Sequence, residues 1–418
     1  MPADERDDLW PVRFTLCFGI ITGLLMAGFF LFIAEETPLA WDFIAYVGGA
    51  EAYLGGETYI GHTPEIGRGE YVYPPIVLLG FIPYALLGDL AIAYVIHSVI
   101  NVALLSWLAW LCIGAIKRHR GSLHPLDTVL VGTFYLLGLY ALIAIGLGQI
   151  DPLVALVIAG MFLAVESRRS SIAGTMLALA AVLKLFPAAF GIWLLKARDW
   201  RSVVMSWLVA TGIGILSLIG FGLHAHLEYA HFLLHDRSRL DEFADGMSPD
   251  FFAVSLARPL SIMPLEITPI TYAVVALLLV SPPLYVIYQR VDSPLDRYVA
   301  FLATIIAILI ALPTTNINHL LYAFFPLLVV LYQLEPGRIR AVFLLGTVIL
   351  LFPIQPGQVT STLVAIGAPS VVVDTVSWVT VRIFATASVA LIGSIVVLIG
   401  CLLYSIEDDQ QATSVSQA

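Results

Sequence analysis

The sequence predicts an all-α, polytopic integral membrane protein, and three observations support this fold class. Of the 418 residues, 60% are hydrophobic and only 12% are charged, whereas soluble domains carry roughly 25% charged residues. The mean hydropathy is +0.94. Apolar runs of about 18 residues or more recur from Leu16 to Leu403, and each is long enough to cross a bilayer as a helix. We therefore predict one transmembrane domain over residues 1–418, whose first apolar run is retained as a helix rather than removed as a signal peptide.

The spans can be placed by hydropathy and oriented by the Lys and Arg residues of short loops. Arg6 and Arg13 place the N-terminus inside. The predicted helices then number about twelve, with both termini inside. They cover residues 12–34, 89–116, 126–147, 149–165, 171–183, 187–197, 202–222, 269–289, 297–313, 319–334, 339–355 and 378–404.

Residues 74–88 are apolar but are predicted not to cross. The run is short and carries three prolines. A crossing here would place the basic residues at 117–120 on the wrong face of the membrane. We therefore predict an external loop over residues 35–88 that contains juxtamembrane helices, and a second external loop over residues 223–268.

The segment around Lys184 is predicted to fold back within the membrane. Arginines at 168–169 precede it, and further basic residues follow at 196–201. Two short helices that turn at the sequence LKLFP keep both basic flanks inside. This turn presents Lys184 toward the outer side. A lysine at a helix centre in the membrane costs about 2.5–3.5 kcal/mol, so Lys184 needs a partner or a water-filled cavity.

The net charge of −10 argues against a nucleic acid partner, which requires a basic surface. The acidity, with lysine at only three positions, is typical of a halophilic archaeon, although a GC-rich genome explains the frequent arginine equally well. Cys17, Cys112 and Cys401 lie in apolar runs without disulfide or metal spacing. The sequence has no P-loop, GxGxxG or DxD motif. We therefore expect neither a cofactor nor a metal, and no nucleotide donor.

Asp42 is the first candidate for chemistry. A carboxylate at the membrane boundary can deprotonate a hydroxyl when partial desolvation raises its pKa. Glu51 lies nine residues later, and we expect it to share the cavity-facing side of a helix with Asp42. Tyr46 and Tyr53 are typical of a sugar-contacting surface. The alternative is an ordinary interfacial segment, in which Asp42 is a surface charge or a helix cap.

Further candidates lie on the other predicted external segments. His319 opens a span, where it orients a carboxylate or a hydroxyl if it meets Asp42, and is otherwise a capping residue. Gln149 and Asp151 occupy a tight turn that equally marks a helix start. Arg258 is a candidate phosphate contact, and a solvated face is its alternative. The four histidines at 224–235 lack helix-facing ligand spacing, so we expect no metal site there.

Four segments, in order along the chain, resemble glycosyltransferase family 87. They are WDFIAYVGGAEAYLGGETY from residue 41, YVYPPIVLLGFIPYALL from residue 71, the stretch from GQIDPL to LKLFP and beyond from residue 148, and PTTNINHLLYAFFPLLVVL from residue 313. The second segment matches a Y-x-Y-P-P motif that includes Tyr73. Two departures concern the acceptor side: Asp151 replaces the usual Asn, and SPDFFAVSLARP stands where an Asn-Gln-Ser motif is common.

The resemblance implies a GT-C type fold and a transferase that takes sugar from a polyprenyl phosphate at the extracytoplasmic face of the plasma membrane. It implies that Asp42 is the catalytic base and His319 its partner. Lys184, Tyr46, Glu51, Tyr73, Gln149, Asp151 and Arg258 would then bind the substrates. The partners would be a polyprenyl-phosphate sugar, most often mannose, a lipid or glycan acceptor, and the membrane lipids.

Two other interpretations stay open from the residues alone. A secondary transporter or lipid flippase would use Asp42, Lys184 and His319 as an ion pathway. No inverted repeat is visible, and the ionisable residues gather on one predicted face. A non-catalytic scaffold would not require any of these residues.

Overall fold

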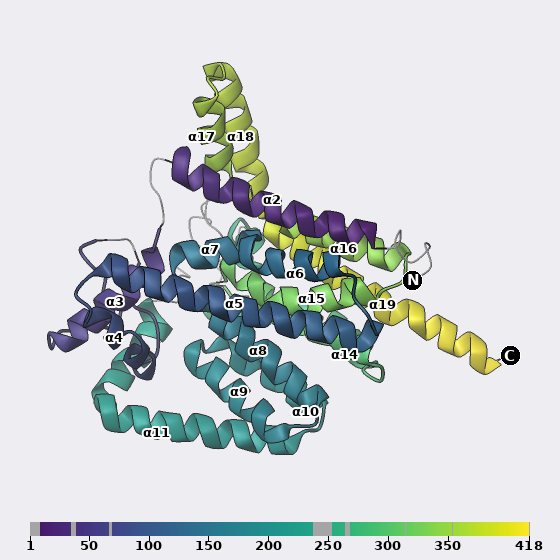
Figure 1. Ribbon diagram of the computed structural model, residues 1–418, viewed down its shortest axis with the longest axis horizontal. Coiled ribbons are helices and arrows are strands. Elements are labelled where there is room, and N and C mark those ends of the chain that lie inside the picture. The colour runs from purple at the N-terminus through teal and green to yellow at the C-terminus, as the bar shows by residue number, and fades with distance from the viewer. Residues whose placement is uncertain are drawn as a thin grey trace. The chain divides into compact units, whose positions relative to one another are not determined.

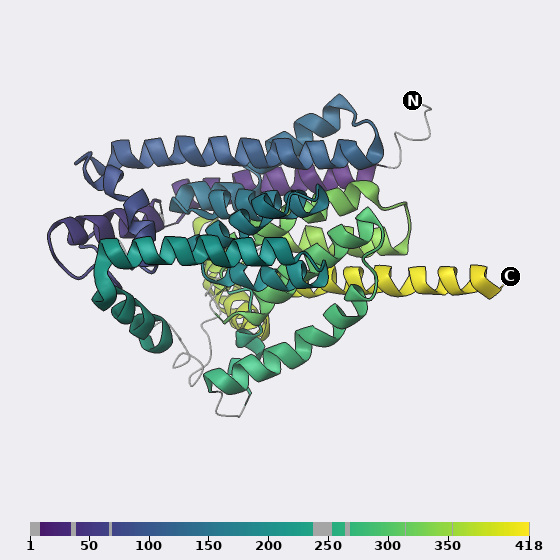
Figure 2. The ribbon, with the colours of Figure 1, turned by 90° about the horizontal axis from the view of Figure 1, so that it is seen from below.

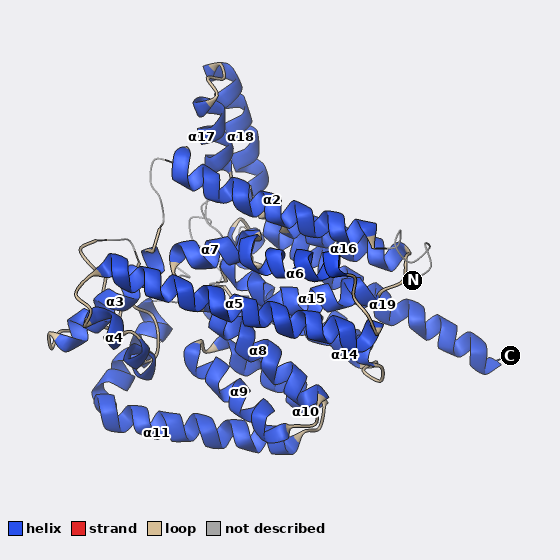
Figure 3. Ribbon diagram, in the orientation of Figure 1, coloured by secondary structure: helices blue, strands red, loops and turns tan. Residues whose placement is uncertain are grey.

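The computed structural model describes residues 9–34, 39–66, 69–236, 253–263, 268–313, 315–352 and 354–417. Within these ranges the chain is helical, and Figure 3 shows helices and loops without a strand. The prediction of an all-α fold is confirmed. A single antiparallel bridge joins Ala253 to Asn316 in the described chain.

The backbone contacts divide the chain into two compact units, where the sequence predicted one domain. The first unit comprises residues 1–37, 109–142 and 239–418, and the second comprises 38–108 and 143–238. Two helices belong partly to each unit by their residue numbers, namely α5 (Leu90–Arg120) and α7 (Leu139–Leu147).

The remaining elements of the first unit are α2 (Trp10–Phe32), α6 (Pro125–Leu137), α12 (Ala257–Ser261), α13 (Pro269–Tyr288), α14 (Pro294–Ala311), η5 (Ile317–Leu320), α15 (Leu321–Gln333), α16 (Arg338–Leu350), α17 (Pro356–Ala365), α18 (Ser370–Thr386) and α19 (Val389–Gln417). Those of the second unit are α3 (Trp41–Leu54), η1 (Pro75–Gly80), α4 (Ile82–Ala85), α8 (Asp151–Glu166), α9 (Ser170–Leu183), η2 (Phe186–Phe190), α10 (Gly191–Lys196), α11 (Trp200–His231) and the π-helical turn η3 (Phe232–Asp236). Figure 1 labels most of them.

Among the residues that the structure describes, seven helices are long and apolar enough to cross a membrane: Trp10–Phe32, Leu90–Arg120, Pro125–Leu147, Trp200–His235, Ile270–Tyr288, Pro294–Ala311 and Val389–Glu407. The other predicted spans correspond to shorter helices, which are α8, α9, η2 with α10, η5 with α15, and α16. The protein is therefore a polytopic membrane protein. The Pro-rich run after residue 74 forms only the short elements η1 and α4, neither of which is long enough to cross a bilayer as a helix, and its external position stays a prediction.

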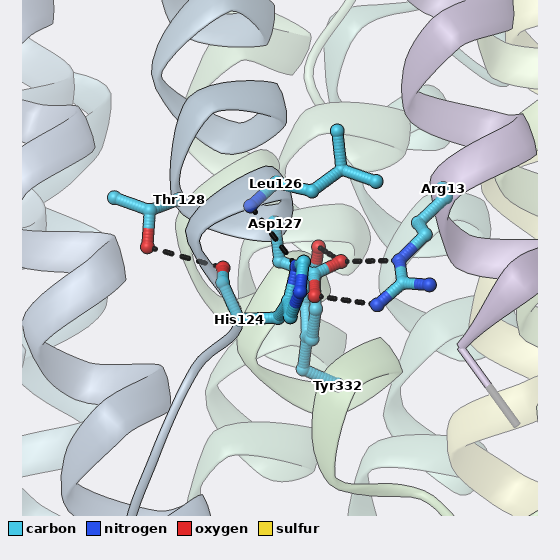
Figure 4. A network of polar contacts seen from close by, with 6 residues as sticks. All are labelled: Arg13, His124, Leu126, Asp127, Thr128 and Tyr332. Carbon is cyan, nitrogen blue, oxygen red and sulfur yellow. Dashed lines mark hydrogen bonds and ion pairs between the residues drawn. The ribbon is translucent and has the colours of Figure 1, made fainter. Parts of the chain in front are cut away.

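A buried ion pair joins three helices of the first unit (Figure 4). Arg13 of α2 donates from Nε and Nη2 to the two carboxylate oxygens of Asp127 in α6, each at 2.8 Å. The Tyr332 hydroxyl of α15 donates to the same carboxylate at 3.2 Å. The side chain of Asp127 is 0% exposed and that of Arg13 is 11% exposed. Such a bidentate pair fixes the angle as well as the distance between the helices.

The predicted fold-back at Lys184 is confirmed in the second unit. The Ser202 hydroxyl at the start of α11 donates to the Ser170 carbonyl at the start of α9, at 3.0 Å. A Cβ on Gly174 would lie 2.3 Å from the Ser202 carbonyl oxygen, so glycine permits this close approach. Helices α9 and α11 begin at the same end. The chain between them, η2 and α10, returns to that end (Figure 1). The basic residues before α9 and after α10 therefore lie together.

Two predicted boundaries differ from the structure. The span predicted at 378–404 is interrupted between α18 and α19, because the Ser388 hydroxyl accepts from the Leu391 amide at 3.1 Å and begins a new helix. The second external loop was predicted from residue 223, but α11 continues beyond a bend at Gly222, where φ is +76° (Figure 2). His226 spans the bend, with Nδ1 donating to the Gly222 carbonyl and Nε2 bonded to the Ser217 hydroxyl, both at 2.8 Å. Residues 237–252 lie outside the described part of the chain.

The Asp127→Asn variant tests the ion pair. It leaves the Arg13 charge without its carboxylate in a buried site, and we expect a loss of about 3–5 kcal/mol in the free energy of unfolding. Thermal unfolding of the detergent-solubilised protein measures this loss. The control is Asp374→Asn on α18, where the carboxylate is exposed. Equal melting temperatures for the two variants would show that the pair does not hold these helices.

Candidate functional site

The helix α3 places Asp42 in its first turn. Ala40 precedes the helix in a left-handed conformation, with φ at +61°, and its amide donates to the Gly146 carbonyl at 2.7 Å. A non-glycine residue rarely adopts this conformation unless its surroundings enforce it. Asp42 is half-buried and Phe43 is fully buried. The start of α3 is thus attached to the end of α7.

The turn after α7 packs against the same helix start. Gly148 has φ at +69°, and a Cβ there would lie 2.5 Å from the Cβ of Phe43. Two features of this position therefore favour glycine: the positive φ and the lack of room for a side chain. This contact brings Gln149 and Asp151 close to the start of α3.

A hydrogen-bonded group of three side chains lies beneath this turn. The Tyr46 hydroxyl donates to Gln149 Oε1 at 3.0 Å and bonds to the Tyr73 hydroxyl at 2.9 Å. All three side chains are buried. Burial raises the pKa of the Tyr46 hydroxyl well above its ordinary value, and Tyr73 and Asp42 add to the effect. Both phenols remain protonated at neutral pH and serve as hydrogen-bond groups.

Lys184 and Asp151 form a buried ion pair beside these tyrosines. Lys184 follows the last residue of α9 and Asp151 is the first residue of α8, so the pair closes the ends of two packed helices. The Lys184 side chain is 10% exposed and that of Asp151 is 0% exposed. The Asp42 carboxylate also attracts the Lys184 ammonium, and both carboxylates act on the two phenols. Lys184 therefore has the partner that its depth requires.

The structure brings together most of the predicted site residues of the second unit. Asp42, Tyr46, Tyr73, Gln149, Asp151 and Lys184 form one group, which we call the Asp42 cluster. It lies at the end of α8 and α9 that is opposite to the basic loops at 167–169 and 196–201.

Glu51 does not join the Asp42 cluster. It lies nine residues after Asp42, which is about two and a half turns of an α-helix, so the two carboxylates face opposite sides. Glu51 is exposed, as expected from this geometry. Tyr53 contacts Tyr59 and Phe221 instead, with ring centroids at 5.5 and 5.3 Å.

His319 and Arg258 belong to the first unit. The His319 Nδ1 accepts from the Asn316 amide at 3.2 Å, which is the capping role that its position also suggested. Its ring stacks on that of Tyr322 at 5.8 Å. Arg258 is fully buried and donates from Nη1 to the Phe384 carbonyl at 2.9 Å. The pairing of His319 with Asp42 stays a prediction.

Two buried polar residues of α5 support the cluster and were missed from the sequence. The Asn101 amide group donates to the Gln149 carbonyl at 3.0 Å. His97 is 5% exposed, stacks on Phe43 at 4.8 Å, and lies against the backbone of Gly148. They are four residues apart, hence on one helix face. Their signal was present, because polar residues inside an apolar span usually face a functional interior.

Metal ligands are not gathered in this way. Within the part of the chain that the structure describes, no three His, Cys, Asp or Glu side chains come together as a metal site. His231, the last residue of α11, and His235 of η3 stack with ring centroids at 4.4 Å.

The apolar helices and the enclosed Asp42 cluster define an integral membrane protein with a buried polar site. The chain belongs to glycosyltransferase family 87, whose sequence model matches residues 71–315, more than half of its length. The protein is thus a membrane glycosyltransferase. This membership favours the transferase over the transporter and the scaffold. The matched range includes Tyr73, Gln149, Asp151, Lys184 and Arg258, but not Asp42 or His319. A search of curated proteins found no match.

The close contact at Gly148 can be tested by Gly148→Ala. The new side chain meets Phe43 and holds an unfavourable backbone conformation, at an expected cost of roughly 1–3 kcal/mol. Gly146→Ala is a matched control, because a Cβ at Gly146 would meet nothing within 4 Å. We expect a lower melting temperature for Gly148→Ala alone. Similar melting temperatures would show that the turn has room to move.

Proposed function

We propose that the protein is an inverting glycosyltransferase. It moves a hexose, most often mannose, from a polyprenyl phosphate to a lipid- or glycan-linked acceptor. The observation that carries the proposal is the half-buried carboxylate of Asp42 close to the buried cation of Lys184, within a family 87 chain. A general base and a phosphate-binding cation are the two groups that this reaction requires.

The reaction proceeds in one displacement. Asp42 accepts the proton of an acceptor hydroxyl as its oxygen attacks the anomeric carbon of the donor sugar. The bond from that carbon to the phosphate oxygen breaks, and the electron pair leaves with the phosphate. Because a phosphate is a stable anion, this leaving group needs no general acid. Lys184 attracts the departing charge, and Tyr46 and Gln149 hold the turn that carries its partner.

The position of the Asp42 cluster supports an extracytoplasmic site. Basic loops remain on the cytoplasmic side of a membrane. In the second unit the basic residues at 168–169 and 196–201 lie at the end of α8 and α9 opposite to Lys184 and Asp151. We therefore propose that the donor is used at the outer face of the plasma membrane, where polyprenyl-linked sugars are accessible to external acceptors.

The Asp42→Asn variant tests the base. Transfer from radiolabelled polyprenyl-phosphate mannose to membrane extracts should fall by roughly 10²–10⁴-fold, since a general base contributes this much. Glu57→Gln, an exposed acid shortly after α3, is the control and should retain transfer. Full transfer by Asp42→Asn would show that Asp42 is not the general base. Donors that carry arabinose or glucose, tested in parallel, decide which sugar is transferred.

His319 can be tested by a double variant. If it orients Asp42 or the acceptor, His319→Ala lowers transfer by roughly ten- to a hundredfold, within the 0.5–3 kcal/mol typical of coupled residues. The variant that also carries Asp42→Asn should then lose little more than Asp42→Asn alone. His224→Ala, at an exposed position on α11, is the control. Fully additive losses would show that His319 only caps its helix.

A further inference from the structure

The Lys184 ammonium is already neutralised by a carboxylate of the protein. It contacts Asp151 within hydrogen-bond distance, and the Asp151 side chain has no exposure to solvent. Asp42 adds a second negative charge nearby. One carboxylate thus contacts the lysine and a second attracts it. A phosphate that binds to Lys184 must therefore displace Asp151 or share the lysine with it.

The donor and the lipid product differ in charge, so competition for Lys184 affects them differently. A sugar-phosphate lipid is a phosphodiester with a single negative charge. After transfer the lipid carries a phosphomonoester, which approaches two charges at neutral pH because its second pKa is near 6. A bare lysine would therefore hold the product more tightly than the donor. An enzyme with such a site would be inhibited by its own product.

We propose that Asp151 is an internal competitor of the lipid phosphate, one that occupies Lys184 between turnovers and promotes release of the product. This inference rests on the proposed function. Asp151 acts through Lys184 and not on the reacting atoms. The carboxylate suits this role because it is tethered at the first residue of α8, where its effective concentration near Lys184 is high and constant. A neutral side chain of similar size at residue 151 would fill the same volume but would not compete with the phosphate for Lys184.

Binding of farnesyl phosphate, a short lipid phosphomonoester, tests the proposal on the full chain in detergent. Calorimetry would compare the wild type with Asp151→Asn, Lys184→Gln, the double variant, and Asp292→Asn as an exposed control. We expect Asp151→Asn to bind the probe roughly ten- to a hundredfold more tightly, or about 1.4–2.7 kcal/mol. Lys184→Gln and the double variant should both bind weakly.

Steady-state kinetics should also show tighter binding of the lipid phosphate by Asp151→Asn. With Asp151→Asn we expect a lower KM for the donor, a lower kcat, and stronger inhibition by the lipid phosphate. A residue that only holds Lys184 in place would instead raise the KM. The double variant removes both charges and leaves no unpaired lysine. Comparing its melting temperature with that of Asp151→Asn shows whether Asp151→Asn is merely poorly folded.

The outcomes separate this inference from the proposed function. If Lys184→Gln weakens binding but Asp151→Asn does not tighten it, the competitor role is wrong and the phosphate site stands. If Lys184→Gln binds farnesyl phosphate as the wild type does, the donor site itself is wrong. Inorganic phosphate and phosphatidylglycerol are tested beside the probe. Equal tightening with either of them would overturn the assignment to the polyprenyl product.

Discussion

The contact between Gly148 and Phe43 is the constraint on which the Asp42 cluster depends. The turn at Gly148 reaches the start of α3 only because the residue has no side chain and adopts a positive φ. Through this contact Gln149 meets Tyr46, and the carboxylates of Asp42 and Asp151 both act on the Tyr46 hydroxyl. His97 and Asn101 of α5 contact the backbone of the same turn. One close backbone approach thus places residues that are about a hundred positions apart in the chain.

Two buried ion pairs illustrate different uses of charge in an apolar environment. A buried charge is costly unless it is paired, so both Asp127 and Asp151 have cationic partners. Arg13 binds Asp127 through two parallel hydrogen bonds and leaves little freedom. Lys184 is a point charge on a flexible stem, which can exchange one anion for another. The geometry of the first pair suits a structural link, and that of the second suits a site that must bind and release.

The predictions from the sequence agree with the structure where they depend on hydropathy and charge. Hydropathy and basic loops predicted the spans and the fold-back at Lys184, because the membrane restricts both length and charge. Sequence motifs predicted most members of the Asp42 cluster. Glu51 was expected to share a helix face with Asp42, and the helical period places it on the opposite side. His97 was missed because one histidine in an apolar span does not reveal which turn it meets.

By itself the sequence determined that the chain is an all-helical membrane protein, and it predicted that the basic loops lie on one face and the candidate site residues on the other. These properties depend on local composition, which the low dielectric of the bilayer selects directly. Only the tertiary structure decided that Lys184 is bound to Asp151, that Tyr46 joins Tyr73 to Gln149, and that Glu51 is left outside. Such contacts join distant segments, and their formation depends on close packing, which the missing side chain of Gly148 permits against Phe43.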